Sequence, residues 1–366
     1  MTARTEVLLD AQPLSSVAAA SGIGSYTRHL LAALAQRPDL AVRALCEDPA
    51  ALPPGVEAVP LHRLTRQPRL ELWEHALRLP VEVRRHRGEG GVFHNPAFHA
   101  PAAVGAPYVQ TLHDVIPLLF DAPDQAALRA RWKRFGPRYR RADMVVAVSQ
   151  HAADEGTRVL GLHPARVVVA PHGVGAEYTP GSPPVDGRPY LLVVSEFSRR
   201  KGFDIAFAVM DSLVDAGYPH RLVMAGQVHD WGRQELDALH AGARHPERIE
   251  IRGYVPDIVS LYQGATAYLM TSRLEGFGLP ALEAMACGTP VVAFDNSSLH
   301  EVVGGGGLLV TDGDVAAFTT AVRSLLDDDA RRREVAEAGV THARSFTWER
   351  SAAIHAAAYR AAADAA

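Results

Sequence analysis

The chain of 366 residues has little lysine, little cysteine and no excess of basic residues. Its only lysines are Lys133 and Lys201, and its formal net charge is −4, so no global charge favours nucleic acid as a partner. The two cysteines, Cys46 and Cys287, have no CxxC or His-rich companion. This excludes a disulfide framework and fits a reducing compartment. No His, Cys or carboxylate cluster has metal-ligand spacing, so we expect no metal.

Long apolar runs are also missing. No segment reaches the ~20 apolar residues of a membrane span, and the apolar run in the first twelve residues, "MTARTEVLLDAQ", is too short for a signal peptide. A GxSxG elbow and a P-loop are both absent. A hydrophobic content of 48% with 21% charged residues is typical of a globular protein, which we expect to be cytoplasmic.

Strand-like runs alternate with helical patterns along most of the chain, which predicts an α/β fold with parallel sheets covered by helices. The predicted strands are "EVLLDAQ", "AVRALC", "PYVQTLHD" and "MVVAVS", then "YLLVVSE", "RLVMAGQ", "IEIRGYV", "TAYLMTS", "PVVAF" and "GLLV". A stretch rich in proline and glycine at 176–189 separates the two series and reads as a linker. We therefore predict two doubly wound domains, 1–180 and 181–345, with ligands between them at the carboxyl ends of the strands.

The last segment, 346–366, predicts a helix that belongs to no further strand–helix unit. Its apolar positions include Trp348, Ala352, Ile354 and Tyr359.

The most informative stretch is "EGFGLPALE" at 275–283, directly after the predicted strand "TAYLMTS". Pro280 suits a first helical position, and Gly288 is placed to end the helix. Glu275 then lies in the loop and Glu283 about one turn into the helix. Backbone N–H groups at a helix start suit a phosphate, and carboxylates are strong acceptors for sugar hydroxyls. This pattern indicates a ligand that is part anionic and part polyol. For any single Glu near a helix start, a capped turn in which the Glu favours the helix dipole is the commoner explanation.

The segment "SRLEGFGLPALEAMACGTPVVAFDNSSLHEVVGGGGLLV" resembles the E-x7-E signature of the retaining family 4 glycosyltransferases. Further resemblances follow in the family's order: "SGIGSYTRHLL", "TLHDVIPLLF", "VVVAPHGV", "SRRKGFD", "VMAGQ", "RGYVPD" and "FTWERSAAIHAAAYRAA". The pattern is most similar to the mannosyl- and rhamnosyltransferase-like branch. The resemblance implies a GT-B fold of two facing Rossmann-like domains, an N-terminal acceptor-side domain and a C-terminal nucleotide-sugar-binding domain. It also implies that 346–366 crosses back to the first domain.

The resemblance also implies site residues. Glu275 contacts hydroxyls of the donor sugar, the amides of the loop formed by Gly276, Phe277, Gly278 and Leu279 hold sugar and phosphate, and Glu283 holds the ribose. Lys201, rare by composition, matches a lysine that meets the diphosphate, and Arg200 matches its neighbour. Tyr254 and Val255, in "RGYVPD", are further donor-binding candidates. Ser195 stands where many members of the family carry an arginine, six positions before the lysine. We therefore expect some of the contacts to the phosphate to differ from those of the family.

Two candidates come from the first half of the chain. His113 ends a predicted strand, and its match in the family contacts the transferred sugar; a hydrogen-bonded structural histidine is the alternative. Gly22 and Gly24 lie in "GIGSYT", which fails as a dinucleotide fingerprint because Thr27 replaces the third glycine. A glycine loop that opens the following helix still lets backbone approach a phosphate or acceptor.

The segment 128–141 is rich in arginine with interleaved aromatic residues. A solvated helix face with an aromatic stripe in the core is the preferred interpretation. The alternative is contact with an acceptor phosphate or an anionic membrane.

These observations predict a retaining glycosyltransferase, a hexosyltransferase without a cofactor. It transfers a hexose from GDP-mannose or a UDP- or dTDP-hexose to a hydroxyl of an acceptor in glycan, glycolipid or secondary-metabolite biosynthesis. Members of the family are usually discussed as reacting on one face of the sugar, with the departing phosphate taking the acceptor's proton. Two alternatives stay open: a non-catalytic sugar-nucleotide-binding protein of the same fold, and an NAD(P)-dependent oxidoreductase.

Overall fold

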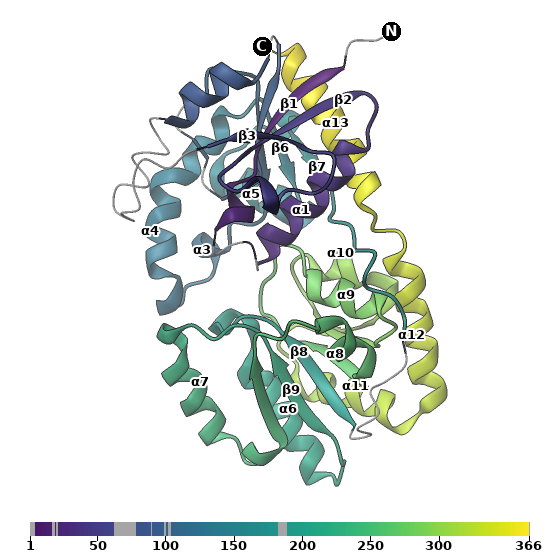
Figure 1. Ribbon diagram of the computed structural model, residues 1–366. Coiled ribbons are helices and arrows are strands. Elements are labelled where there is room, and N and C mark those ends of the chain that lie inside the picture. The colour runs from purple at the N-terminus through teal and green to yellow at the C-terminus, as the bar shows by residue number, and fades with distance from the viewer. Residues whose placement is uncertain are drawn as a thin grey trace. The chain divides into compact units, whose positions relative to one another are not determined.

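The computed structural model describes residues 4–16, 19, 21–61, 78–88, 90–98, 100–101, 104–181 and 189–365. Residues 182–188, half of the predicted linker at 176–189, therefore lie outside the described residues. The chain divides into two compact units, and each is described here by itself (Figure 1). Unit 1 comprises the described residues of Met1–Leu119, Ala126–Gly173 and Thr347–Ala366, and unit 2 those of Phe120–Gln125 and Val174–Phe346. The main change from unit 1 to unit 2 follows Gly173, earlier than the predicted boundary at 180.

Unit 1 is built on a parallel sheet whose described strands follow the order β3-β2-β1-β4-β5-β6-β7. The strands are β1 (Thr5–Asp10), β2 (Leu40–Cys46), β3 (Glu57–Pro60), β4 (Val92–Asn95), β5 (Tyr108–Leu112), β6 (Met144–Ala147) and β7 (Val167–Val169). The order reverses between β1 and β4, as in doubly wound folds, which bind ligands beyond the carboxyl ends of the strands at such a reversal.

The helices of unit 1 include α1 (Gly22–Ala35), α3 (Ile116–Leu119), α4 (Ala126–Phe135), α5 (Gln150–Leu160) and α13 (Trp348–Asp364), and the described residues 78–86 are also helical. Ser149 caps α5, since its hydroxyl oxygen accepts a hydrogen bond from the Ala152 N–H at 3.0 Å. The helix ends at Gly161, whose φ of +66° suits glycine.

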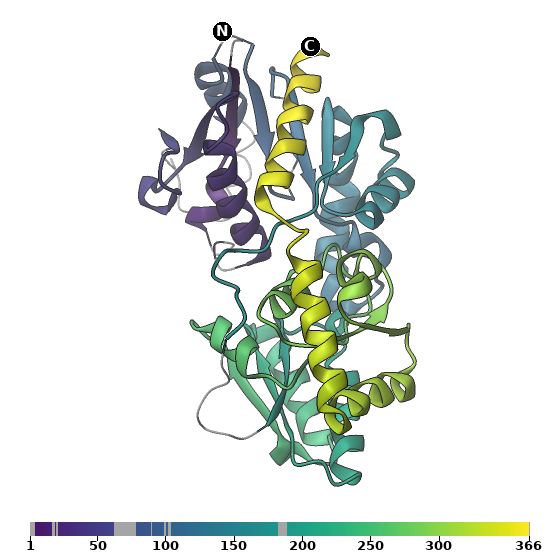
Figure 2. The ribbon, with the colours of Figure 1, turned by 90° about the vertical axis from the view of Figure 1, so that its right-hand side faces the viewer.

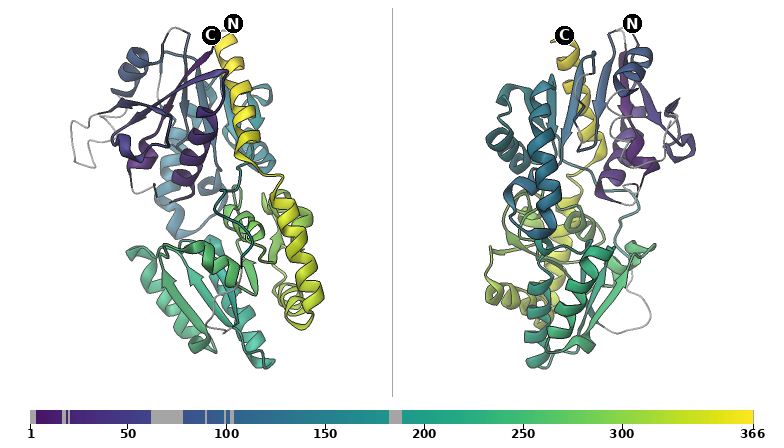
Figure 3. Two further views of the ribbon diagram at one scale, coloured as in Figure 1. Left: turned by 45° about the vertical axis from the view of Figure 1, so that its right-hand side comes forward. Right: turned by 90° about the vertical axis from the view of Figure 1, so that its left-hand side faces the viewer.

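Helix α13 completes the core of unit 1 from the far end of the chain. It packs beside α1 and against β5 and β6 (Figures 2 and 3). Trp348, Ala352 and Tyr359 are buried in one cluster with Tyr26 and Leu30 of α1, and Ile354 packs at its edge. Burying a large apolar side chain contributes about 1.5–3 kcal/mol, so α13 is an integral part of this unit.

Unit 2 repeats the architecture with a parallel sheet of described strands in the order β10-β9-β8-β11-β12-β13. The strands are β8 (Tyr190–Val194), β9 (Arg221–Ala225), β10 (Ile249–Gly253), β11 (Ala267–Met270), β12 (Val291–Asp295) and β13 (Leu308–Thr311). Here the order reverses between β8 and β11. The loops that follow these two strands are therefore the expected ligand-binding loops of the unit.

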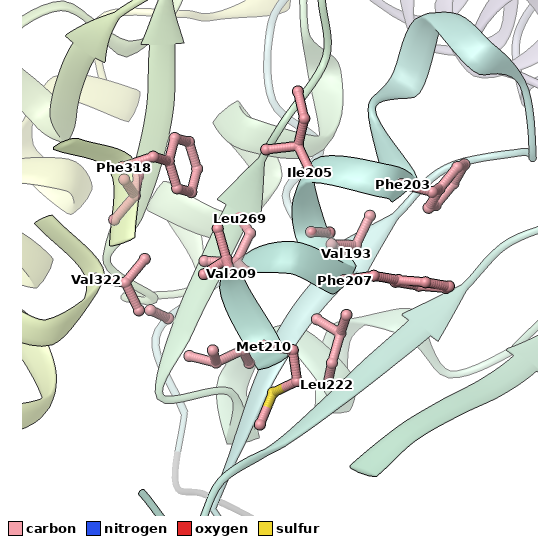
Figure 4. Close-up of a cluster of buried hydrophobic side chains, with 14 of the residues drawn as sticks. Val193, Phe203, Ile205, Phe207, Val209, Met210, Leu222, Leu269, Phe318 and Val322 are labelled. Atoms are coloured by element: carbon pink, nitrogen blue, oxygen red, sulfur yellow. The ribbon is translucent and has the colours of Figure 1, made fainter. Parts of the chain in front are cut away.

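The helices of unit 2 are α6 (Phe203–Asp215), α7 (Asp230–Gly242), α8 (Ile258–Gly264), α9 (Leu279–Ala286), α10 (Leu299–Val303), α11 (Val315–Asp327) and α12 (Asp329–Ala343). Helices α6 and α11 cover the sheet with a cluster that includes Phe207, Met210, Phe318 and Val322 over Leu269 of β11 (Figure 4). This core fixes the strand ends from which the candidate site is built.

The fold agrees with the prediction of two parallel α/β sheets. Three described strands, β3, β4 and β7, were not among the predicted ones. They span four, four and three residues. Two of these strands carry residues that strands disfavour: Asn95 at the end of β4 and Pro60 at the end of β3.

Candidate active site

Two loops of unit 2 meet at the carboxyl ends of β8 and β11. The first loop carries a short 3-10 turn, Arg199–Lys201, and ends at Gly202, whose φ is +66°. The Arg273 N–H donates to the carbonyl oxygen of Arg200 at 2.8 Å, and the Thr271 hydroxyl donates to that of Lys201 at 3.0 Å. A Cβ atom at Gly202 would lie 2.1 Å from the Thr271 carbonyl oxygen. Glycine is therefore required for this close approach.

The crossing of these loops brings Arg200 and Lys201 to Glu275. Lys201 Nζ lies 2.6 Å from Glu275 Oε1, and an Arg200 guanidinium nitrogen lies 2.9 Å from Oε2. The same nitrogen donates to the Leu274 carbonyl oxygen at 2.7 Å. The side chains of Arg200, Lys201 and Glu275 are 14%, 12% and 8% exposed. Three charged groups that sum to one positive charge are thus held together in a largely dehydrated place.

The ionisation of this cluster follows from burial and pairing. Burial alone would raise the pKa of Glu275, but Lys201 and Arg200 outweigh it and lower that pKa to about 2. Burial and the nearby Arg200 lower the pKa of Lys201, and Glu275 acts against them. Glu275 is therefore an anion whose two oxygens are already paired. The sequence predicted an acceptor for sugar hydroxyls at this position but not this double pairing.

Serine side chains hold the loop of Glu275. The Glu275 N–H donates to Ser297 Oγ at 3.0 Å. The Ser298 hydroxyl lies 3.0 Å from the Glu275 carbonyl oxygen and 2.9 Å from that of Phe277. Ser297 adopts a φ of +45°, which is uncommon for a residue other than glycine. Such strain persists only where the surroundings enforce it, and it clusters at functional sites.

Helix α9 begins directly after this loop. Gly278, with a φ of +103°, precedes Leu279 and Pro280, so the predicted loop-to-helix turn is present, with proline at the second helical position. The first N–H groups of a helix have no acceptor within the helix, and the helix dipole makes this end attractive to an anion. Gly276, Phe277, Gly278 and Leu279 form the backbone of the turn beside Glu275.

Glu283 lies one turn further along α9 and differs from Glu275 in its surroundings. The Tyr262 hydroxyl donates to Glu283 Oε2 at 2.9 Å. Burial raises the pKa of Glu283 to about 7, although hydrogen bonds from Tyr262 and Tyr178 act to lower it. The sequence contained no signal for these tyrosines, because Tyr262 is 21 positions away.

His113 lies in unit 1, just beyond β5. Its Nε2 lies 2.7 Å from the Pro96 carbonyl oxygen, so Nε2 carries the hydrogen in this contact. Burial lowers the pKa of His113 to about 4, so the imidazole is neutral at pH 7. The edge of Tyr26 packs on it, with ring centroids 5.0 Å apart. Both features of His113 considered from the sequence, the strand-end position and the structural hydrogen bond, are present.

A buried polar network supports the ring of Tyr26. The Tyr26 hydroxyl lies 2.9 Å from Thr111 Oγ1 and 2.9 Å from His355 Nε2 of α13. His172 stacks on the Tyr26 ring with centroids 4.8 Å apart. These residues lie in stretches that resemble the family, but nothing in the sequence singled them out or predicted their contacts, because they come from distant segments.

The structure corrects the expected glycine loop. Gly22 and Gly24 lie within the first turn of α1, which begins at Gly22, so no loop of glycines precedes the helix. Neither residue is among those with positive φ. Ser21 provides no side-chain cap. Any ligand contact at Gly22 or Gly24 would therefore be a contact with a helix N-terminus.

Tyr254 and Val255 follow β10, the edge strand of the unit 2 sheet. The Tyr254 side chain is 68% exposed, a high value for a large aromatic residue. Strand β9 separates β10 from β8. The strand order thus sets these two residues further from Lys201 than the loop that carries Glu275.

The arginine-rich segment forms α4 and a 3-10 turn, Gly136–Arg141. Trp132 and Tyr139 are buried and stack with centroids 5.4 Å apart. Arg134, Arg140 and Arg141 are exposed. This is the arrangement of a solvated face over an aromatic stripe.

Comparison with known proteins decides the family. Residues 177–342 match the family model described as glycosyl transferases group 1, and residues 20–178 match that of glycosyltransferase family 4. O-antigen chain mannosyltransferase B of Escherichia coli is 30% identical over 276 residues, which cover 70% of this chain and 71% of that protein. The chain belongs to the family 4 glycosyltransferases.

Solved structures of glycosyltransferases share the fold. Sucrose-phosphate synthase from Thermosynechococcus elongatus matches with a TM-score of 0.78 at 22% identity, over 99% of this chain and 100% of that one. HepE from Anabaena, in complex with UDP and glucose, matches with a TM-score of 0.71 at 17% identity, over 94% and 96%. This glycosyltransferase therefore has the GT-B fold, and each unit is one of its Rossmann-like halves.

Family membership confirms that the protein is an enzyme that transfers a sugar from a nucleotide sugar. The dehydrogenase and non-catalytic alternatives are not supported. Within the part of the chain that the structure describes, no helix is long and apolar enough to cross a membrane. Over the same residues, no cluster of three or more His, Cys, Asp or Glu side chains could hold a metal ion.

Proposed function

We propose that this glycosyltransferase is a retaining hexosyltransferase that binds a nucleoside diphosphate hexose on unit 2, at the ends of β8 and β11. The observation that carries the proposal is the cluster of Arg200, Lys201 and Glu275 beside the start of α9. These groups lie at the reversal of strand order, where doubly wound sheets bind their ligands.

The main requirement of the reaction is to stabilise the negative charge that develops on the diphosphate as its bond to the sugar breaks. Groups that are positioned in advance for developing charge stabilise a transition state most effectively in a dehydrated site. Arg200 and Lys201 are such groups, because Glu275 holds both in place with short contacts. The N–H groups at the start of α9 add a partial positive charge. Lys201 and Arg200 thus take the diphosphate, and Glu275 takes the hydroxyls of the donor sugar.

Glu283 is assigned to the ribose of the nucleotide. A carboxylate accepts both hydroxyls of a diol, and its position one turn into α9 separates it from the phosphate contacts at the helix start. Tyr254 and Val255 are assigned to the remainder of the donor, in line with the family resemblance. The exposed ring of Tyr254 suits a stacking contact.

Unit 1 supplies the acceptor side of the reaction in this proposal. His113 is assigned to the transferred sugar near the reacting carbon, and a neutral imidazole at pH 7 suits contact with a sugar hydroxyl better than a second cation would. Gly22 and Gly24, at the start of α1, are assigned to an acceptor or phosphate contact. The acceptor carries a hydroxyl on a glycan, a glycolipid or a secondary metabolite.

The donor base and hexose are proposed as GDP-mannose or a UDP- or dTDP-hexose. The relative from Escherichia coli is named as a mannosyltransferase, and HepE holds UDP and glucose, so both donor classes have support. For the exposed arginines of 128–141 we propose contact with an anionic membrane surface or acceptor phosphate.

A panel of nucleotide sugars tests the donor assignment. Each donor is first screened by thermal shift, since a ligand that binds the folded state raises the Tm by mass action. Release of the nucleoside diphosphate is then followed for each donor that binds. We expect one of the proposed donors to raise the Tm and to be turned over, and the absence of binding for the whole panel would contradict the proposal.

A further inference from the structure

Three segments of unit 2 that are distant in the chain converge on the Glu283 carboxyl. Tyr262 comes from α8, Tyr178 from the stretch 174–181 that precedes β8, and Glu283 itself from α9. The Tyr262 hydroxyl donates to Glu283 Oε2 at 2.9 Å, and the Tyr178 hydroxyl also hydrogen-bonds to the carboxyl. The two tyrosine rings pack edge to face with centroids 6.1 Å apart.

The three segments are also fastened to one another. Gln263, the neighbour of Tyr262 on α8, donates to the Thr179 carbonyl oxygen at 2.8 Å. The Thr289 hydroxyl, beyond the end of α9, donates to the carbonyl oxygen of Tyr262. Tyr262 is fully buried, and Tyr268 of β11 packs on it with centroids 5.8 Å apart. The positions of both hydroxyls are therefore fixed by the fold.

We infer that Tyr178 and Tyr262 are positioning residues, which hold the Glu283 carboxylate as the acceptor for the hydroxyls of a nucleotide's ribose. The inference rests on the proposed role of Glu283. Two donors to a carboxyl restrict its rotation and leave its remaining lone pairs for a ligand. They also favour the charged form, which accepts stronger hydrogen bonds than a neutral acid does.

The titratable groups that act on this carboxyl are Tyr262 of α8 and Tyr178 and Glu177 of the stretch 174–181. Tyr268 of β11 and Cys287, just after α9, are also near it, and the charge of Glu283 raises the pKa of each. Burial and Glu177 favour the protonated acid, and the two tyrosine hydroxyls oppose them. With a pKa of about 7, Glu283 changes its charge within the range of ordinary assays.

This balance predicts that nucleotide affinity depends on pH through Glu283. The ionised carboxylate is the better acceptor, so affinity rises as the pH rises through the pKa. A tyrosine without its hydroxyl no longer favours the charged form, so the pKa of Glu283 moves up. Loss of a hydrogen bond of this kind corresponds to a rise of about 1 unit or more in the pKa of the carboxyl.

The test is calorimetric titration of UDP and of GDP between pH 5.5 and pH 9 with wild type, Glu283→Gln and Tyr262→Phe. The ratio of Kd for Glu283→Gln to Kd for wild type cancels the titration of the nucleotide's own phosphates. We expect this ratio to rise roughly tenfold between pH 6 and pH 8. For Tyr262→Phe, the ratio of Kd for Glu283→Gln to Kd for Tyr262→Phe should rise about 1 pH unit higher than the ratio for wild type. At pH 9 the affinity of Tyr262→Phe should be near that of wild type.

Two further variants separate positioning from general damage to the fold. Tyr178→Phe removes the second hydroxyl. Because the Tyr178 side chain is only half-buried, this variant replaces Tyr262→Phe in the test if Tyr262→Phe folds poorly. Tyr268→Phe is the matched control, because its hydroxyl donates to the Val194 carbonyl oxygen at 3.2 Å and not to Glu283. The control should leave the midpoint of the pH profile unchanged.

The outcomes distinguish this inference from the proposed function. If Glu283→Gln binds as tightly as wild type at every pH, the ribose assignment of Glu283 fails, and the inference fails with it. If Glu283→Gln binds weakly but both tyrosine variants keep the wild-type midpoint, only the inference is overturned. A uniform loss of affinity at every pH in the tyrosine variants would also overturn it, because it indicates a packing defect.

Discussion

Glu275 and Glu283, at the two ends of the stretch 275–283, have pKa values that are shifted in opposite directions. The pKa of Glu275 is lowered to about 2, and that of Glu283 is raised to about 7. Both carboxyl groups experience burial, but only Glu275 has two cationic partners. One acid is therefore a permanent part of a charged cluster, and the other is a group that ionises near neutral pH.

This difference predicts opposite effects of the two amide substitutions on stability. The folded pKa of Glu283 lies above its ordinary value of 4.5, so its contribution to stability is present at low pH and is lost as the pH rises through about 7. Glu283→Gln should therefore raise the Tm relative to wild type at pH 8.5 and change it little at pH 5. We expect a few degrees, since about 1 kcal/mol corresponds to roughly 2–4 °C in a domain of this size.

Glu275 has a lowered pKa, so its contribution is present above 4.5 and is lost as the pH falls toward 2. Glu275→Gln should lower the Tm at pH 8.5, because it leaves the buried charges of Lys201 and Arg200 without their partner. Thermal denaturation of both variants at the two pH values measures this. Changes of the same sign in both variants at pH 8.5 would contradict the assigned states.

Lys201→Ala should lower the turnover rate roughly a hundredfold or more, because it removes a positive group that meets charge on the leaving diphosphate. The chain offers one matched control, since the only other lysine, Lys133, is exposed on α4. Steady-state rates with a confirmed donor should fall for Lys201→Ala and stay near wild type for Lys133→Ala. A rate within threefold of wild type for Lys201→Ala would show that this lysine does not stabilise the leaving diphosphate.

Gly202→Ala tests whether the crossing of the two loops positions the site. Its Cβ would lie 2.1 Å from the Thr271 carbonyl oxygen at a φ of +66°, so the turn that carries Lys201 must move. We expect a fall in kcat of at least tenfold, since positioning accounts for several kcal/mol of catalysis. Gly217→Ala is the control, with a φ of +85° and nothing within 4 Å of its Cβ. Equal activity in the two variants, each normalised to its folded fraction, would show that loop contact is unimportant.

The sequence predicted the strands that carry the candidate site and the turn into α9, because apolar runs and Gly/Pro positions are local signals. Lys201 stood out by composition, and the resemblance associated it with the same ligand as Glu275. Their ion pair depends on the order of β8 and β11 in the sheet, which is a property of the tertiary fold. The contact of Tyr262 with Glu283 joins α8 to α9 and depends on the tertiary fold in the same way.

Shorter elements and helix boundaries were less predictable. Strand β4 ends in His94 and Asn95, and these polar residues interrupt the apolar pattern by which a central strand is predicted. Both are buried and hydrogen-bonded: His94 Nε2 lies 2.8 Å from Thr111 Oγ1, and the Asn95 amide donates to Gln110 at 3.0 Å. Gly22 resembled a loop residue because glycine is a poor helix former, yet it opens α1.

The account depends most directly on Glu283 as a ligand of the nucleotide. Calorimetric titration of wild type and Glu283→Ala at pH 8 with UDP, GDP and dTDP measures this without a need for the acceptor. A carboxylate that accepts hydroxyl hydrogen bonds contributes about 1.5–3 kcal/mol. We expect wild type to bind at least one of the three nucleotides, and Glu283→Ala to weaken this binding at least tenfold while it retains a cooperative unfolding transition. Equal affinity in the two proteins, or no binding of any of the three nucleotides to wild type, would contradict this.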